Sequence, residues 1–407
     1  MSIKNAISLF SGAGGDTCGL ERAGFKVVAY NEFNEYAILT HQKEHPDSQL
    51  IVNPINQNND ITKIDDSVFT EYTDKIDLIF AGFPCQGFSH AGKKKVNDKR
   101  NELVYEFARV VNIVKPKWII GENVKGLLSR KGKEQNQNEN SKLKPVIDII
   151  SDLFNKIGYK ITYKVIDCKD VGVPQNRKRL IIVGHRGDLY PHMPWDNLTP
   201  STNPDVHNIR SFLQPHLNNA LEMRDIYKSH EQSTNYWIIT NQTTPTGTPH
   251  KNLERLMNGI RNISKKEKEI NPSTNQNKQI IEQNGLISFG VRKGGYHGMV
   301  LNPDVPCNTI ISTYNLCPRL FVGLHNPTIN KYWVRCMTPS ELGQIQGFPE
   351  NYQWQGPVSN QIIQIGNAVP PTLAERIAKS IENIEFKDYP QNIPNVNQSD
   401  DDEEDDE

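Results

Sequence analysis

The stretch NAISLFSGAGGDTCGLERAGFKVVAYNE, residues 5–32, decides the fold. An apolar run at residues 5–10 leads through a glycine-rich turn into a helix-like segment at residues 15–24, and a second apolar run follows at residues 26–32. A strand, a helix and another strand in this order form a β-α-β unit, whose two strands lie parallel. The sequence therefore predicts that the chain begins with a parallel sheet.

The same alternation continues to about residue 185. Apolar runs at residues 76–82, 117–123, 160–167 and 178–186 predict strands, and helical patterns at residues 34–45, 101–115 and 144–158 predict helices. Strands that alternate with helices at this spacing build a sheet that helices cover on both faces. We predict an α/β fold in residues 1–188, with a doubly wound, mostly parallel sheet of the Rossmann-like type.

The rest of the chain has a different pattern. Residues 189–334 are rich in Asn, Pro and Thr with short β-like runs, which predicts a second, smaller, β-rich domain. Helical periodicity at residues 335–386 predicts a return to the first domain, and residues 387–407 are expected to be disordered. A polar insertion at residues 131–144 is expected on the surface.

Composition narrows the class of protein. Only 36% of the 407 residues are hydrophobic, no run approaches the ~18 apolar residues of a membrane span, and the N-terminus has no secretory pattern. The six cysteines are scattered without a CxxC pair, which argues against a zinc site or a disulfide framework. We expect a cytoplasmic protein that is neither secreted nor bound to a membrane and that holds no metal.

The charge is unevenly distributed. Eight of the 47 acidic residues form the run at residues 400–407, and the rest of the chain carries 46 basic residues against 39 acidic ones. A basic body with an acidic tail suits a protein that binds a polyanion. The alternative for the tail is a solubilising end without a further role.

The glycine-rich turn suggests a ligand. The G-x-G-x-x-G fingerprint fails because Thr17 occupies the third position after Gly12 and Gly14, and no phosphate-binding loop occurs elsewhere. Glu32 ends the second strand, where doubly wound folds bind ribose hydroxyls, and Asp60 is expected at the end of the third strand, near an adenine amino group. This combination indicates an adenosine ligand without pyrophosphate, namely S-adenosylmethionine. Alternatively, the glycines only form a turn and Glu32 is a solvated charge.

The segment LIFAGFPCQGFSHAGKKK, residues 78–95, suggests a nucleophile. Cys85 follows the carboxyl end of a strand, and a run of lysines after it would favour the thiolate and attract an anion. The alternative is an inert, packed thiol. Glu122 and Asn123 end another strand and could hydrogen-bond the edge of a heterocycle. Two arginines that enter a strand at alternate positions, Arg177 and Arg179, could bind phosphate or a base carbonyl, or form a salt bridge at the sheet edge.

These motifs carry a resemblance to a known family. The strings LFSGAGG, GFPCQGFS, ENV, QNRKR, RCMTPSELGQIQGFPENY and QIIQIGNAVPPTLAERIA occur in this order between residues 5 and 385. In this the chain resembles the C5-cytosine-specific DNA methyltransferases of restriction–modification systems. The resemblance implies an enzyme that acts as a monomer on double-stranded DNA, uses S-adenosylmethionine, and protects the DNA from a cognate restriction enzyme.

The resemblance also assigns roles to residues. The catalytic set is Cys85, Glu122, Arg177 and Arg179. The cofactor-binding set is Phe10, Gly12, Ala13, Glu32, Phe33, Asp60, Ile61, Pro84, Leu103, Asn367 and Val369. The nucleic-acid-binding set is Gln86, Ser89, Lys93, Lys94, Lys95, Thr309 and Ile310.

The implied chemistry is covalent catalysis on a cytosine that has been flipped out of the duplex. The Cys85 thiolate would add to C6 and make C5 nucleophilic, while a protonated Glu122 holds N3. Arg179 would donate to O2, and Arg177 would hold the loop or a phosphate. Two alternatives are a tRNA cytosine methyltransferase of the same fold and a catalytically silent DNA-binding protein. The first usually carries a Cys-Phe-Thr string, which is absent here, and the second would not need the thiol.

Overall fold

The structure is a computed structural model of the chain. It describes residues 4–84, 103–132, 143–187, 195, 198, 208–214, 221–223, 281–283, 286–288, 299–314, 320–326, 328 and 331–382. The predicted tail at residues 387–407 lies outside this part of the chain.

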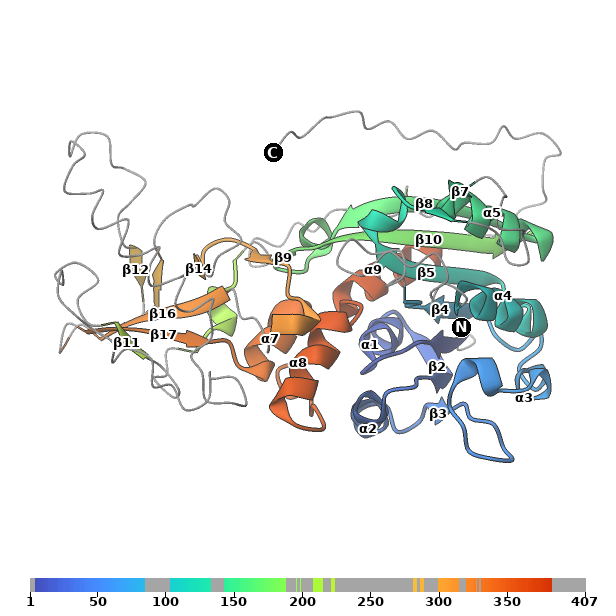
Figure 1. Cartoon of the computed structure of the whole chain (residues 1–407), viewed down its shortest axis with the longest axis horizontal. Helices are drawn as coiled ribbons and strands as arrows, with labels where there is room; N and C mark the ends of the chain where they lie inside the picture. Colours follow the sequence, from blue (N-terminus) through green and yellow to red (C-terminus); the bar gives the residue numbers. More distant parts are fainter. Residues whose placement is uncertain are drawn as a thin grey trace.

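A seven-stranded sheet forms the centre of the larger part of the molecule (Figure 1). In spatial order its strands are β3 (Gln49–Leu50), β2 (Phe25–Asn31), β1 (Lys4–Leu9), β4 (Leu78–Ala81), β5 (Trp118–Val124), β10 (Lys178–Arg186) and β8 (Tyr159–Asp167). The first five pair in parallel, whereas β10 runs antiparallel to both of its neighbours. The predicted doubly wound, mostly parallel α/β sheet is confirmed.

Helices cover both faces of this sheet. On one face lie α1 (Gly15–Arg22) and α9 (Pro371–Glu382), and on the other α3 (Asp66–Thr70), α4 (Leu103–Val114) and α5 (Val146–Lys156). Within β4, Phe80 packs into the core on the α1 and α9 side, while its neighbour Ile79 packs into the core on the α4 and α5 side. Alternate residues of a strand point to opposite faces, so an unbroken apolar run is what such a doubly covered strand requires.

The strand order places a switch point at β1. The chain moves from β1 to β2 and β3 on one side and then crosses to β4 and β5 on the other. Where the order reverses in this way, the segments that leave the carboxyl ends of the strands diverge and leave a crevice. The helix after β2, α2 (Glu35–Glu44), packs near α8 (Val358–Asn367) beside this crevice.

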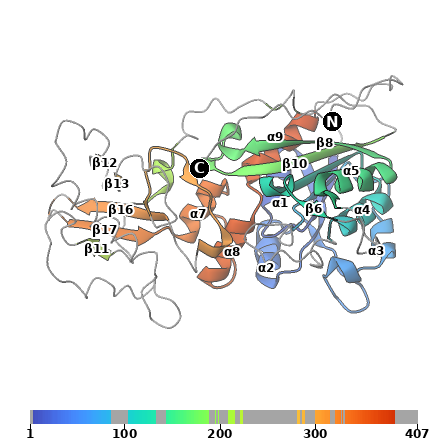
Figure 2. The same ribbon diagram turned by 45° about the horizontal axis from the view of Figure 1, so that its top comes forward.

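A second sheet lies beyond α7 (Pro339–Gln346) and α8, away from the first sheet in both ribbon views (Figures 1 and 2). Its order is β11 (Leu221–Met223), β17 (Lys331–Cys336), β16 (Leu320–Asn326), β13 (Leu286–Ser288) and β12 (Ile281–Gln283), with β14 (Met299–Val300) beside β16. The predicted boundary at residue 334 falls inside β17. The domain limits stay a prediction.

A buried ion pair attaches the second sheet to the returning helices. Arg335 in β17 donates two hydrogen bonds, of 2.7 and 2.8 Å, to the carboxylate of Glu341 in α7, and both residues are about 1% exposed. The backbone N–H of Gln214 donates to the same carboxylate at 2.9 Å. Thr338 caps α7 and shares a capping box with Glu341. One carboxylate therefore ties the distant segment at Gln214 to β17 and α7, which are neighbours in the chain.

Two short strand pairs complete the described part. β9 (Gln175–Asn176) pairs in parallel with β15 (Cys307–Asn308), and β6 (Lys131–Gly132) pairs with β7 (Lys144–Pro145) at the two ends of the predicted polar insertion. None of the described helices is long and apolar enough to cross a membrane.

Candidate active site

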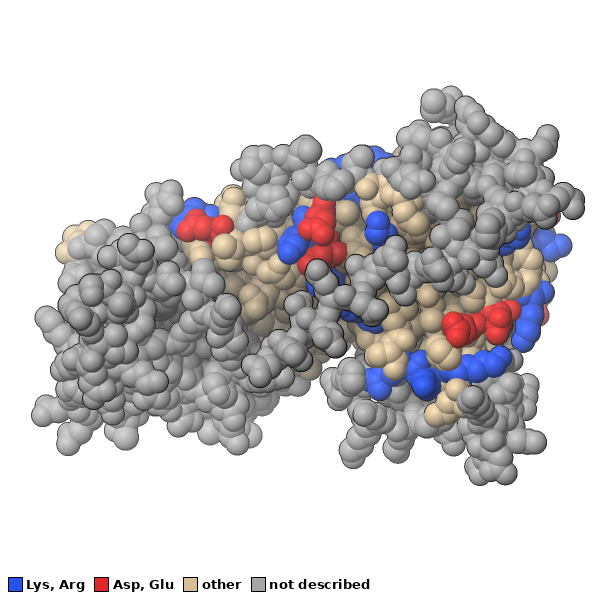
Figure 3. Space-filling view, turned by 90° about the horizontal axis from the view of Figure 1, so that it is seen from above, with Lys and Arg blue, Asp and Glu red and all other residues tan. Residues whose placement is uncertain are grey.

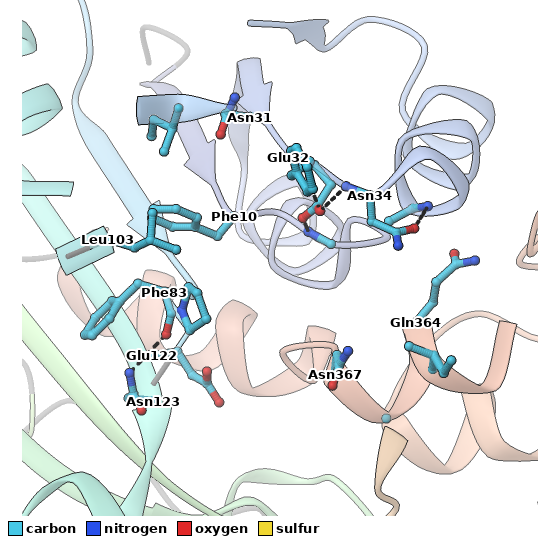
Figure 4. Close-up of a pocket in the computed structure, with 18 of the residues that line it drawn as sticks. Phe10, Asn31, Glu32, Asn34, Phe83, Leu103, Glu122, Asn123, Gln364 and Asn367 are labelled. Atoms are coloured by element: carbon cyan, nitrogen blue, oxygen red, sulfur yellow. Dashed lines mark hydrogen bonds between the residues drawn. The ribbon is translucent and has the colours of Figure 1, made fainter. Parts of the chain in front are cut away.

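A cavity of about 690 Å³ opens at the carboxyl edge of the first sheet, beside the switch point. Its walls come from the ends of β1, β2, β4 and β5, from the residues that lead into β10, and from α8 (Figure 4). The residues of the predicted site that line it are Phe10, Gly12, Glu32, Phe33, Asp60, Ile61, Pro84, Leu103, Glu122, Arg177, Arg179 and Asn367. One cavity thus holds both the predicted cofactor end and most of the predicted catalytic end.

The turn after β1 brings its backbone to the cavity wall. Phe10 (φ 55°), Gly12 (φ 57°) and Gly14 (φ 86°) all have left-handed backbone conformations. This region is costly for an aromatic residue such as Phe10, which marks a turn that its surroundings hold in place. A Cβ at Gly12 would meet no atom within 4 Å, so this glycine leaves backbone open to a ligand.

Glu32 is fixed by three backbone N–H groups. Its Oε1 accepts hydrogen bonds from Phe33 (2.8 Å) and Asn34 (2.7 Å), and its Oε2 accepts one from Gly12 (2.8 Å). The carboxylate therefore joins the end of β2 to the glycine-rich turn, and Figure 4 shows it on the opposite side of the cavity from Glu122. Phe33 beside it is 70% exposed and presents an apolar ring at the mouth of the cavity.

Asp60 has a different position from the expected one. The third strand ends at Leu50, and Asp60 instead caps the single-turn helix η1 (Ile61–Lys63), where its Oδ1 accepts from the backbone N–H of Thr62 at 3.2 Å. The residue still lines the cavity. The expectation of a strand end was wrong because nine residues, 51–59, separate β3 from Asp60.

Glu122 and Arg179 form an ion pair in the cavity wall. The Nε of Arg179 lies 2.7 Å from Oε1 of Glu122, and each side chain is 12% exposed. β5 and β10 are antiparallel, with Arg179 opposite Val124 and Ile181 opposite Glu122, so the two charged side chains are diagonal neighbours. Sequence alone pointed to both residues, but their pairing depends on the reversed direction of β10.

Arg177 is buried and satisfies backbone oxygens. Its guanidinium donates to the carbonyls of Ile310 (2.9 Å), Gly366 (3.1 Å) and Ala368 (3.1 Å), and it is 1% exposed. Burial, and to a smaller extent the positive charge of Arg179, lowers the pKa of Arg177 to about 9. Between the two roles expected for Arg177, these contacts favour holding a loop over binding a phosphate.

Asn123 is used inside the protein. Its Nδ2 donates to the backbone oxygen of Phe83 at 3.0 Å, and its Oδ1 accepts from the N–H of Val124 at 2.9 Å. The residue lines the cavity but is 2% exposed, and these two bonds hold its amide toward Phe83 and Val124. It fixes the segment that leads through Pro84 to Cys85. Cys85 lies outside the described residues, as do Gln86, Ser89, Lys93, Lys94 and Lys95.

Ala13 and Val369, from the predicted cofactor set, lie behind the cavity wall. The carbonyl of Ala13 accepts a hydrogen bond from the hydroxyl of Tyr352, and the carbonyl of Val369 packs so closely on Gly15 that a Cβ there would lie 2.2 Å from it. Their contacts support the turn and join α1 to the segment after α8.

One face of α8 was not foreseen as part of the site. Five residues of this helix line the cavity, and four of them, Asn360, Ile363, Gln364 and Asn367, stand at positions i, i+3, i+4 and i+7; the fifth is Gly366. This spacing puts them on one helix face. The helical periodicity of the segment was recognisable in the sequence, so the whole face could have been inferred from Asn367.

Two of the residues predicted to contact nucleic acid, Thr309 and Ile310, lie in the described part of the chain, and only the first is exposed. The exposed Thr309 donates its hydroxyl to the carbonyl of Asn176 at 2.6 Å. The side chain of Ile310 is buried in an apolar cluster, and its N–H donates to Gln175 at 3.0 Å. In the part of the chain with assigned positions, no group of three or more His, Cys, Asp or Glu side chains could hold a metal ion.

The family model described as C-5 cytosine-specific DNA methylase matches residues 4–383. The chain belongs to this family. It is a DNA (cytosine-5)-methyltransferase, and the predicted family and enzyme class are confirmed.

Individual relatives agree with this assignment. The type II methyltransferase M.PspPI of Psychrobacter sp. is 32% identical over 385 residues, which is 92% of this chain and 78% of that protein. M.DdeI of Desulfomicrobium norvegicum is 28% identical over 397 residues, 93% of this chain and 88% of that protein. This protein is thus similar to the methyltransferases of type II restriction–modification systems.

A solved structure shows the same fold. The crystal structure of a prophage-encoded protein from E. coli, described as a DNA modification methyltransferase, gives a TM-score of 0.58 at 23% identity. The match covers 93% of this chain and 99% of that chain.

Proposed function

We propose that this methyltransferase takes the methyl group of S-adenosylmethionine and transfers it to C5 of a cytosine flipped out of double-stranded DNA, with Cys85 as the covalent catalyst. The observation that carries the proposal is the single cavity that Glu32 and the Glu122–Arg179 pair share. A methyl donor and a base that occupy one cavity can be held close to each other and in a fixed orientation.

The residues at the β1–β2 end fit the adenosine part of this cofactor. The carboxylate of Glu32 is held by three N–H donors and keeps lone pairs for ribose hydroxyls. Asp60 offers a further acceptor, and the exposed ring of Phe33 offers an apolar face for a purine. S-adenosylmethionine would supply an electrophilic methyl group at the inner end of this site.

Glu122 and Arg179 would act on the cytosine. As the base enters, the ion pair opens, so that Arg179 donates to O2 and Glu122, once it has taken up a proton, donates to N3. The thiolate of Cys85 forms a bond to C6, the C5–C6 π electrons become available at C5, and the proton of Glu122 neutralises the charge that would develop on the ring. After C5 carries the methyl group, loss of the C5 proton to a base and cleavage of the C6–S bond restore the aromatic ring, and the proton at N3 returns to Glu122.

DNA would approach the mouth of the cavity. Gln86, Ser89, Lys93, Lys94, Lys95 and Thr309 are proposed as contacts to it. Ile310, also expected to contact DNA, has a buried side chain and would instead hold Thr309 in place. The face over β8 and α5 shows Lys and Arg mixed with Asp and Glu among its described residues, not a patch of one sign (Figure 3). We therefore assign the DNA to the cavity side, where the two sheets flank α7 and α8, with the protein acting as a monomer in the compartment that holds the DNA.

Bisulfite sequencing of plasmid DNA from cells that express the protein tests the proposal. Cytosines in one short sequence should resist conversion in the presence of the wild-type protein and convert fully with Cys85→Ser. A purified wild-type protein that transfers no label from S-adenosylmethionine to plasmid DNA, or that labels tRNA transcripts instead, contradicts the proposal.

A further inference from the structure

Two histidine rings, His41 of α2 and His45 at the C-terminal end of that helix, pack against the glycine-rich turn. A Cβ at Gly14 would lie 2.7 Å from the ring of His45 and 3.1 Å from the ring of His41, so both rings contact the backbone of the turn directly. His41 is fully buried and His45 is 6% exposed. Phe10 and Gly12 of the same turn line the cavity.

His41 connects α1, β2 and the glycine-rich turn behind the cavity wall. Its Nε2 lies 3.0 Å from the hydroxyl oxygen of Thr17 in the first turn of α1. Its ring stacks on Tyr30 with 3.6 Å between the ring centroids and 13° between the planes, and Tyr30 stands two residues before Glu32 in the chain. The hydroxyl of Thr17 is in turn 3.4 Å from that of Ser11, within the turn itself.

The surroundings keep the His41 ring neutral. Its Nδ1 is buried and has no hydrogen-bond partner among the described residues. Burial, followed by the nearby His45, holds the pKa of His41 well below its ordinary value. A neutral imidazole has one hydrogen-bond donor and one acceptor. In His41 the hydrogen bond to Thr17 uses Nε2, the nitrogen on the side of α1.

We propose that His41 is a positioning residue for the cofactor: through Thr17 and Gly14 it holds residues 10–17 in the conformation that binds S-adenosylmethionine. The inference rests on the proposed function, because it takes the cavity to be the cofactor site. Neither His41 nor Thr17 lines the cavity, so any effect they have on binding is indirect.

A double-mutant cycle tests the proposal. His41→Phe keeps a ring against Tyr30 and Gly14 but removes the nitrogen, and Thr17→Val removes the hydroxyl with little change of shape. Each substitution should weaken the binding of S-adenosylmethionine about tenfold in calorimetry, and the double variant should bind no more weakly than either single one. His41→Gln can still reach Thr17 and should recover part of the affinity. Additive losses in the double variant, or affinities within about twofold of wild type, would overturn the proposal.

Hydrogen exchange of the cofactor-free protein provides a readout that does not depend on the ligand. His41→Phe should speed the exchange of amides in residues 10–17 by about tenfold and leave β5 unchanged. His185→Phe is the matched control. His185 is also buried, but it lies near the end of β10, whereas the cavity is near the start of that strand at Arg179. Unchanged exchange in residues 10–17 contradicts a positioning role. A wild-type protein that fails to bind S-adenosylmethionine would instead contradict the proposed function.

Discussion

Asn123 donates its side-chain amide to the backbone oxygen of Phe83 across 3.0 Å, and this bond ties the end of β5 to the segment that leads into Cys85. Phe83 is itself buried and packs against Phe107 of α4, with 6.1 Å between the ring centroids. The approach to the proposed nucleophile is therefore anchored on both sides, by a hydrogen bond and by an aromatic contact.

Asn123→Ala should lower the turnover number about a hundredfold, because a displacement of about 1 Å at the nucleophile is enough for an effect of that size. Its affinity for S-adenosylmethionine should stay within about twofold of wild type. Asn31→Ala is the matched control, since Asn31 is also a buried strand-end asparagine but holds the carbonyls of Ile51 and Asn59 on the opposite side of the cavity. That variant should weaken cofactor binding first. Single-turnover methylation measures the rate, and calorimetry measures the affinity for S-adenosylmethionine. The assignment would be contradicted if Asn123→Ala and Asn31→Ala changed the rate equally and the affinity equally.

The two arginines should differ in what their loss affects. Arg177→Met removes the hydrogen bonds to three buried carbonyls, of which, among the described residues, only that of Ala368 keeps another donor, Gln346. The substitution should lower the free energy of unfolding by about 3 kcal/mol. Arg179→Met leaves the fold largely intact but removes the proposed donor to O2, and should lower turnover by about a hundredfold to a thousandfold. Urea unfolding and methyl-transfer assays separate the effects. An Arg177→Met protein of wild-type stability would contradict the role of this residue as a brace.

The strands and helices of the first sheet could be predicted because the apolar runs and helical patterns correspond to elements buried on both sides of a sheet. The position and register of β10 beside β5 could not, since an apolar run does not say which strand it pairs with, and so the pairing of Glu122 with Arg179 was hidden. The motifs named residues but not what they contact. Asn123 was expected to face a heterocycle, yet it is buried against Phe83.

Asp16 makes stability depend on pH in an unusual direction. Burial raises the pKa of Asp16 from 3.8 to about 6, although the hydroxyl of Ser8 and the N–H of Thr17 donate to its carboxylate. The folded state therefore binds this proton more tightly than the unfolded state does. The stability that Asp16 contributes is full below about pH 4 and is lost as the pH rises through about 6, a change of about 3 kcal/mol.

Asp16→Asn removes this titration. Relative to wild type, the variant should gain stability as the pH rises from 4 to 8, and the gain should level off above about pH 7. Urea unfolding across this range measures the difference at each pH. A difference that stays constant from pH 4 to 8 would show that the buried carboxylate does not titrate in this window.

The proposed covalent step predicts a stable adduct with a modified substrate. In a duplex with 5-fluorocytosine at the target position, the fluorine cannot leave C5 as a proton does, so the final cleavage of the C6–S bond is blocked. The protein should remain bound to the DNA after denaturation, and only when S-adenosylmethionine is present. Cys85→Ser should abolish the adduct, because a hydroxyl is scarcely ionised near neutral pH.

The four cysteines that the structure describes are poor candidates for this reaction. Burial raises the pKa of Cys18 to about 11 and the pKa values of Cys168, Cys307 and Cys336 to about 12, so each stays a thiol at neutral pH. Serine substitutions at these four positions, and at Cys317, should therefore leave the adduct intact in every variant that folds. Peptide mapping of the adduct identifies the cysteine that carries the DNA. Attachment at a residue other than Cys85 would refute the choice of nucleophile, and the absence of an adduct on a duplex that the enzyme methylates in its unmodified form would refute the covalent mechanism.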